Sequence, residues 1–176
     1  MPFFAPYPPW VSVSRIEYVL DHDGWDEARR LAATRRALML VAADATDAET
    51  DIPWHLHKNW PQSVAEAAER LRDRFVRQDK RADDYMQTGV EPLADEVARG
   101  DFLTFVPYAY DATIWADGQV LASLADEGTS LVVALTAEQR DALAGAVGVG
   151  RVVTLQAWRH RHPSVLRRLI RRLRGS

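Results

Sequence analysis

The spacing of apolar residues in the first third of the chain predicts strands and one helix. Residues 11–20 begin with strict apolar–polar alternation and are rich in β-branched and aromatic side chains, which predicts a strand. Residues 25–36 carry apolar side chains at helical spacing and predict a helix that Asp23 caps, with a hairpin as the alternative. The short apolar run 37–43 predicts a buried strand, and the polar, Trp-rich stretch 46–61 predicts a loop.

The middle of the chain carries the clearest helical pattern. Residues 63–80 place Val, Ala, Leu and Phe along one stripe, and Ser63 with Glu66 forms a capping-box pattern, so a helix is predicted over this range. A shorter helix is expected over 92–99, and Gly100 is expected to end it.

The last third of the sequence has the pattern of a β-meander followed by a helix. Asp117-Gly118 stands between two short apolar runs and predicts a type I′ hairpin turn. Thr136 and Gln139 form a capping box ahead of a helix over 137–147. The expected strands are 102–110, 113–116, 119–122, 130–135 and 152–157.

The two ends of the chain have compositions of their own. Four prolines and four aromatic residues in 1–10 predict an extended arm, which we expect to lie along its own domain or a neighbouring subunit. Its expected contact residues are Phe3, Phe4, Tyr7 and Trp10. Residues 159–176 predict a basic amphipathic helix that starts at Pro163 and docks on the domain.

These elements together predict an α+β fold. Consecutive strands joined by tight turns give an antiparallel or mixed sheet, and three to four helices pack on it. The 176 residues fit one compact domain over 11–158, preceded by the arm 1–10 and followed by the basic helix 159–176.

Composition and charge narrow the function classes. The chain has no Cys, which excludes thiolate metal sites and cysteine nucleophiles. The net charge is −3, yet residues 159–176 hold seven Arg and no acid, so residues 1–158 carry 15 basic and 25 acidic residues. An acidic body repels nucleic acid, so nucleic acid is not the expected partner. No run of apolar residues reaches the length of a membrane span, and a cytoplasmic location is the simplest expectation.

The segment Tyr18 to Gly24 ends a hydrophobic strand in the motif Asp21-His22-Asp23-Gly24. It resembles the first motif of haloacid-dehalogenase-like phosphatases, which implies Asp21 as nucleophile, Asp23 as proton shuttle and Mg²⁺ between them. Trp25 departs from the Thr or Val usual in that family. The alternative is an ordinary turn in which an Asp caps the next helix.

The segment Trp54 to Trp60 supports two hypotheses. Two Trp, two His, a Lys and an Asn in seven residues are typical of an interface, unless both Trp simply cover the core. His55 and His57 are also candidates for a metal site together with the pair His160 and His162; the alternative is that these are surface or packing histidines. The expected partner-binding residues are Trp54, His55, His57, Lys58 and Trp60.

The Arg face of the terminal helix can contact an anion or a partner. Docking of the apolar face leaves the Arg side chains to pair with the acidic body or a protein partner, and an anionic membrane surface is the alternative. The Arg residues concerned are Arg167, Arg168, Arg171 and Arg172.

The sequence thus favours a non-enzymatic protein-interaction module that resembles small acidic bacterial inhibitor or immunity proteins. It would bind a protein partner or associate with itself, and it needs no cofactor. Two alternatives stay open: a metal-dependent phosphohydrolase that uses Asp21 and Asp23, and a structural or assembly subunit.

Overall fold

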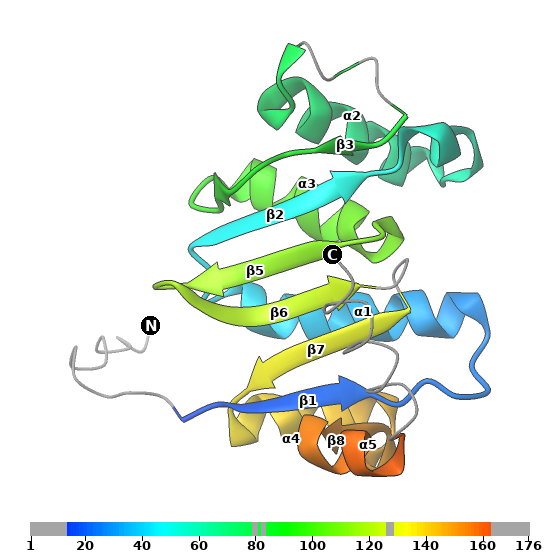
Figure 1. Cartoon of the computed structure of the whole chain (residues 1–176), viewed down its shortest axis with the longest axis vertical. Helices are drawn as coiled ribbons and strands as arrows, with labels where there is room; N and C mark the ends of the chain where they lie inside the picture. Colours follow the sequence, from blue (N-terminus) through cyan, green and yellow to red (C-terminus); the bar gives the residue numbers. More distant parts are fainter. Residues whose placement is uncertain (1–13, 79–80, 82–83, 126–128, 163–176) are drawn as a thin grey trace, which may run out of the picture.

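The fold is α+β, as the sequence predicts: an eight-stranded antiparallel sheet with helices packed against it (Figure 1). The computed structural model describes residues 14–162 except 79–80, 82–83 and 126–128. The strands lie in the order β3-β2-β5-β6-β7-β1-β8, and β4 pairs with β2 beside β3. The expected N-terminal arm and the helix beginning at Pro163 lie outside the described residues.

Helices separate single strands and short groups of consecutive strands along the chain. The strands are β1 (Ile16–Leu20), β2 (Asp47–Ile52), β3 (Met86–Gln87), β4 (Glu91–Pro92), β5 (Ala112–Ala116), β6 (Gln119–Ala125), β7 (Ser130–Leu135) and β8 (Val152–Thr154). The α-helices are α1 (Glu27–Ala42), α2 (Gln62–Phe75), α3 (Glu96–Phe105), α4 (Ala137–Val147) and α5 (Leu155–Arg161). Among the described residues, the 3₁₀ helices η1 (Trp54–Asn59), η3 (Val106–Tyr108) and η4 (Val149–Arg151) link some of these elements. No helix in the described part of the chain is long and apolar enough to span a membrane.

Helix α1 confirms the helix expected over 25–36 and corrects the strand expected over 37–43. The helix runs on to Ala42, because the run Ala-Leu-Met-Leu-Val-Ala-Ala consists mostly of strong helix formers and its length alone does not distinguish a strand from a buried helix. Its cap is Asp26, whose side chain accepts a hydrogen bond from Arg29 N at 2.8 Å, and not Asp23.

Strand β2 replaces the loop expected over 46–61. Its sequence Asp-Ala-Glu-Thr-Asp-Ile is polar, yet it pairs with β5 on one side and with β3 and β4 on the other. The residues that face the helices are Ala48, Thr50 and the terminal Ile52. Because two of these side chains are small, the segment has no apolar run from which a strand could be predicted.

Helices α2 and α3 begin and end away from the predicted positions. Pro61 occupies the N-cap of α2 with no side-chain hydrogen bond, so the Ser63–Glu66 capping box is wrong, and α2 ends at Phe75. Asp95 caps α3, which continues through Gly100 instead of ending there. The strand expected over 102–110 is wrong, because Phe102 and Phe105, three residues apart, lie buried on one face of this helix.

The last third of the chain follows the prediction more closely. Asp117 (φ 49°) and Gly118 (φ 78°) form the turn between β5 and β6, both in the left-handed region that a type I′ turn requires. Thr136 and Gln139 form the expected capping box of α4. The strand expected over 152–157 ends at Thr154, whose hydroxyl caps α5 by accepting from Ala157 N at 3.2 Å.

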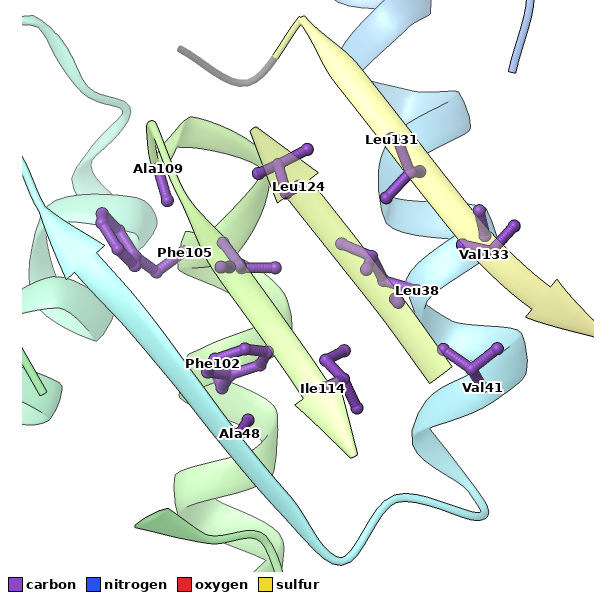
Figure 2. Packing of buried hydrophobic residues seen from close by; sticks show 14 of the residues in the cluster. Leu38, Val41, Ala48, Phe102, Phe105, Ala109, Ile114, Leu124, Leu131 and Val133 are labelled. Carbon is purple, nitrogen blue, oxygen red and sulfur yellow. The ribbon is translucent and has the colours of Figure 1, made fainter. Parts of the chain in front are cut away.

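The hydrophobic core lies between the sheet and helices α1 and α3 (Figure 2). Leu38 and Val41 of α1 point toward the central strands, and Phe102 and Phe105 of α3 cover β2 and β5. Phe105 is fully buried, so its ring contributes several kcal/mol, on the order of 3–5, to the free energy of unfolding.

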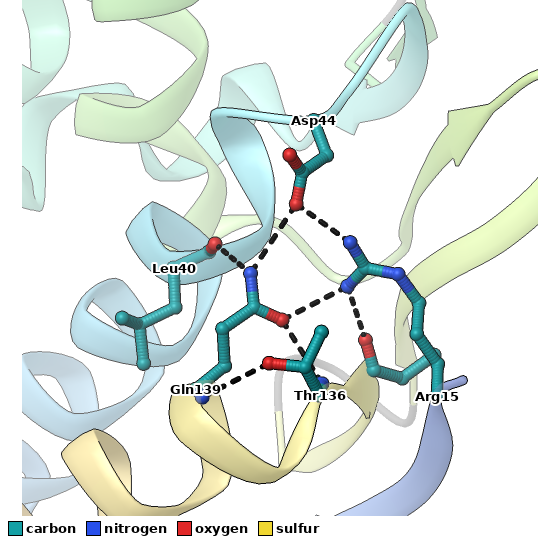
Figure 3. A network of polar contacts seen from close by, with 6 residues as sticks. Arg15, Leu40, Asp44, Thr136 and Gln139 are labelled. Atoms are coloured by element: carbon teal, nitrogen blue, oxygen red, sulfur yellow. Dashed lines mark hydrogen bonds and ion pairs between the residues drawn. The ribbon is translucent and has the colours of Figure 1, made fainter. Parts of the chain in front are cut away.

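A polar network joins the residue before β1 to the C-terminal end of α1 and the N-terminal end of α4 (Figure 3). Arg15 forms an ion pair with Asp44 at 2.6 Å and donates to Gln139 Oε1 at 2.9 Å. Gln139 Nε2 in turn donates to the Leu40 carbonyl at 2.8 Å and lies 3.3 Å from Asp44. The network satisfies the Leu40 carbonyl near the C-terminal end of α1 and fixes α4 against that helix.

The register of the sheet places acidic residues on the face away from α1 and α3. Ile52 and its partner Met86 are buried in the core, so Asp51 and its partner Gln87 project to the opposite face. Glu49, two residues from Asp51 on β2, projects to the same face. This face carries the candidate site.

Candidate functional site

Asp51, near the end of β2, is a buried carboxylate with one oxygen that lacks a partner. Its residue is 1% exposed. Oδ1 accepts hydrogen bonds from Tyr110 N at 2.9 Å and Asp111 N at 3.0 Å. Oδ2 is buried and accepts no well-aligned hydrogen bond from the part of the chain that the structure describes, although the Tyr85 hydroxyl lies near the carboxyl and favours its charged form. A buried polar atom without a well-aligned partner is rare and destabilising, so Oδ2 is a candidate to accept a hydrogen bond from a ligand.

Asp51 lines a small polar cavity. The cavity has a volume of about 40 Å³, whereas one water needs ~10–15 Å³. It can therefore hold a group of a few non-hydrogen atoms. The lining residues are Glu49, Thr50, Asp51, Gln87, Gly89, Asp111 and Ala112.

The segments around the cavity are held by backbone and threonine hydrogen bonds. Thr50 N donates to Thr88 Oγ1 at 3.1 Å, and Thr88 N donates to the Thr50 carbonyl at 3.0 Å. The Thr50 hydroxyl lies 3.2 Å from the Asp111 carbonyl. These bonds connect β2 to the residues after β3 and before β5, so the cavity walls are fixed before any ligand arrives.

The electrostatic environment disfavours the charged form of Asp51. Burial raises the pKa of its carboxyl above the ordinary 3.8, and the negative charge of Asp111 adds to this rise. The backbone N–H groups of Asp111 and Tyr110 and the Tyr85 side chain lower the pKa but do not cancel the rise. A positively charged group in the cavity would replace the hydration that the carboxylate has lost.

Tyr85 lies beside the Asp51 carboxyl and remains partly open to solvent. Burial and the charge of Asp51 raise the pKa of its phenol to about 12, so the hydroxyl keeps its proton at neutral pH. The residue is 45% exposed. An aromatic side chain therefore lies next to Asp51, although Tyr85 is not among the residues that line the cavity.

His55 contacts both the segment that carries Tyr85 and the segment that carries Tyr110. Its backbone N donates to the Asp84 carbonyl at 3.3 Å, next to Tyr85. Its ring lies edge-on to that of Tyr110, with centroids 6.2 Å apart. Among the predicted partner-binding residues, His55 is thus one that contacts Tyr110, whose backbone N–H binds Asp51.

The other predicted residues of the Trp54–Trp60 segment pack mainly against the protein itself. Trp54 stacks on His57 with centroids 4.8 Å apart, and the Arg72 guanidinium lies 4.2 Å from the Trp54 ring centroid. Trp60 contacts Phe105 edge-to-face at 5.2 Å. Both Trp cover the core from outside, as the alternative in the sequence analysis describes, while Lys58 is exposed. Partner contact by this segment stays a prediction.

The Asp21–Gly24 motif forms a turn that Arg151 holds. Asp21 N donates to the Arg151 carbonyl at 2.9 Å, and Arg151 Nη1 donates to the Asp23 carbonyl at 2.9 Å. Asp21 Oδ1 lies 3.5 Å from Asp23 N, as in an Asx-turn. The motif follows β1, which is antiparallel to both of its neighbours, β7 and β8. The segment is therefore a turn, and the catalytic role of the two carboxylates stays a prediction.

The histidine pairs do not meet in the structure's described part. Nδ1 of His57 lies 2.7 Å from the Trp54 carbonyl, and Nδ1 of His162 lies 3.1 Å from the Trp158 carbonyl. Within residues 14–162, apart from the three gaps, no three His, Asp or Glu side chains converge as metal ligands. The expected arm contacts and the Arg residues from 167 to 172 lie outside the described residues.

Asp51 and the cavity around it were not predicted from the sequence. The signal was present as acids at 47, 49 and 51, which is the period-two pattern of a strand with one acidic face. The proximity of Asp111 and Tyr85 has no local signal, because 60 residues separate Asp51 from Asp111.

Comparison of the chain with protein-family models, curated proteins and solved structures found no match. The site must therefore be interpreted from its own chemistry. It can accept hydrogen bonds and positive charge in a preformed cavity, and it offers an aromatic ring beside them.

Proposed function

We propose that this protein is a non-catalytic interaction module that binds a positively charged protein partner, as small acidic inhibitor or immunity proteins do. The observation that carries the proposal is the buried Asp51 carboxyl, which lines a cavity with one oxygen unpaired and with Asp111 beside it. A group that lowers the stability of the free protein is expected to gain its partner in a complex.

The charge distribution supports the same proposal. Residues 1–158 carry ten more acidic than basic residues. Such a field steers a basic partner toward the acidic surface and raises the association rate at low salt. The cavity then provides a specific contact after the encounter, and covering a basic surface is a direct means of inhibiting a partner.

The rival phosphohydrolase interpretation has less support. The Asp21 and Asp23 backbone groups are bound in a turn by Arg151, and β1 enters that turn from an antiparallel sheet. The two carboxylates lack a third acidic or histidine ligand in a metal-binding arrangement among the described residues.

Affinity capture from a lysate of the source organism tests the proposal. The bait is the full chain as wild type, Asp51→Asn, and the control Glu138→Gln, which removes one exposed carboxylate in the first turn of α4. We expect wild type and control to retain the same basic protein in stoichiometric amount, to release it at high salt, and Asp51→Asn to retain at least about tenfold less. Equal retention by Asp51→Asn, or no stoichiometric partner for any bait, would contradict the proposal.

A further inference from the structure

The cavity at Asp51 collects hydrogen-bond acceptors from three separate segments. Glu49 and Asp51 project from one face of β2, Asp111 precedes β5, and Gln87 belongs to β3. No basic side chain stands among the lining residues that the structure describes. The cavity is therefore an acceptor-rich site whose ligand must bring hydrogen-bond donors and positive charge.

The hydrogen-bond acceptors lie on different sides of the cavity, and this arrangement suits some cations better than others. A metal ion needs ligands that converge on one point, and the described side chains do not converge in that way. An ammonium group is a compact and strongly hydrated charge that is costly to bring into a small cavity. A guanidinium group is planar and weakly hydrated, and its five N–H donors point outward in several directions.

We infer that this cavity binds the guanidinium group of an arginine side chain from the partner. The inference rests on the proposed function and names the chemical group that its partner inserts. Asp51 Oδ2 accepts the first hydrogen bond, because it is the unpaired atom. Asp111 and Glu49 supply acceptors on neighbouring sides of the cavity, and the half-exposed Tyr85 supplies an aromatic ring beside them.

The free protein is prepared for this ligand by its backbone. The hydrogen bonds from Tyr110 N and Asp111 N hold Asp51 Oδ1, so the carboxylate cannot rotate to bring Oδ2 to another donor without losing them. The same two N–H groups report on the site, since charge binding at Oδ2 changes the hydrogen bonds at Oδ1.

Titration of the ¹⁵N-labelled full chain with three short peptides tests the inference. The probes are acetyl-Gly-Arg-Gly-amide, its lysine analogue and its citrulline analogue, which keeps the shape of arginine but lacks the charge. We expect the arginine peptide to shift the Tyr110 and Asp111 amide signals, with an affinity at least about tenfold above that of either analogue. Equal shifts with the lysine peptide, equal shifts with Mg²⁺, or no shift at millimolar arginine peptide would overturn the inference.

Matched variants show whether the peptide-induced shifts arise from binding at Asp51. Asp51→Asn keeps the size of the side chain and should abolish the shifts, whereas Glu138→Gln should leave them unchanged. Because Asp51 is buried, the folding of its variant is checked by thermal unfolding, and Glu49→Gln, at a half-buried position, provides a second variant that should weaken binding severalfold. Arginine-peptide shifts that survive both Asp51→Asn and Glu49→Gln would also overturn the inference.

The outcome can be separated from that of the proposed function. If a captured partner depends on Asp51 but the arginine peptide leaves the two amides unmoved, the interaction module stands and the arginine assignment is wrong. If the peptide binds as expected but no protein partner depends on Asp51, the cavity is an arginine site and the proposed function is wrong.

Discussion

Asp51 and Asp111 hold each other through two hydrogen bonds of equal length. Asp51 N donates to the Asp111 carbonyl at 3.0 Å, and Asp111 N donates to Asp51 Oδ1 at 3.0 Å. This pairing fixes two acidic side chains at one cavity, where the charge of Asp111 disfavours the charged form of Asp51. The arrangement lowers the stability of the free protein, and a cationic ligand would reverse that effect.

Replacement of Asp51 by Asn should therefore stabilise the protein at neutral pH. The folded protein binds the Asp51 proton more tightly than the unfolded chain does, because burial raises the pKa of this carboxyl above 3.8. Wild type thus loses stability relative to Asp51→Asn as the pH rises from the ordinary aspartate pKa through the raised value. Urea unfolding of both proteins at pH 7.0 and at about pH 3.5 measures the difference.

The pH dependence of the stability difference distinguishes the effect of the Asp51 charge from any change in packing that the substitution causes. The stability advantage of Asp51→Asn should shrink at the lower pH, where the wild-type carboxyl is protonated. An advantage for wild type at pH 7.0, or a difference that does not change with pH, would show that the charge of Asp51 does not destabilise the fold.

The fold could be predicted where local signals agree with tertiary packing. The Asp117-Gly118 turn and the Thr136–Gln139 capping box carry their own geometry, and both are confirmed. Strand β2 and the apolar end of α1 could not be predicted in this way. The first is polar and depends on strands on both sides, and the second has a composition that suits a buried strand or a buried helix.

Phe105→Ala should lower the free energy of unfolding by about 3–5 kcal/mol. The Phe105 ring is fully buried between α3 and the sheet and contacts Trp60 edge-to-face. Val97→Ala in the same helix is the control, since Val97 is 64% exposed, and it should change stability by less than about 0.5 kcal/mol. Denaturant unfolding measures both. Equal effects of the two substitutions would contradict the packing of α3 described above.

Two glycine-to-alanine substitutions should change the stability of the protein in opposite directions. Gly118 has a φ of 78° in the hairpin turn, so Gly118→Ala should destabilise the protein by about 1–2 kcal/mol. Gly100 lies exposed inside α3 with no atom within 4 Å of an added Cβ, so Gly100→Ala should stabilise it by about 0.5–1 kcal/mol. Thermal unfolding compares them. Loss of stability in Gly100→Ala would favour the helix end that the sequence indicates at this residue.

Gln139→Ala should destabilise the protein by about 1–2 kcal/mol, because it removes half of a capping box and leaves the Leu40 carbonyl without its side-chain donor. Glu138→Ala changes the neighbouring exposed position and serves as the control. Chemical denaturation of both variants checks the result. A Gln139→Ala protein as stable as the control would show that the network in Figure 3 adds nothing to the joining of α1 and α4.

The candidate site was less predictable than the fold. His55 stood out in the sequence because it belongs to a Trp- and His-rich segment, but Asp51 stood in a stretch that was interpreted as a loop. Its importance comes from burial and from an unpaired oxygen, which exist only after β2, β3 and β5 have assembled. The acids at 47, 49 and 51 indicate one acidic strand face, but the burial of Asp51 depends on contacts distant in sequence that this local pattern does not encode.

The central claim is that the Asp51 carboxylate binds a cationic group of a ligand. A ¹³C NMR titration of the Asp51 side-chain carboxyl tests this claim most directly. The pKa should lie above 3.8 in the free protein and should fall when acetyl-Gly-Arg-Gly-amide is present in excess, because a bound cation favours the charged carboxylate. A pKa at or below the ordinary aspartate value in the free protein, or one that the arginine peptide leaves unchanged, would contradict the claim.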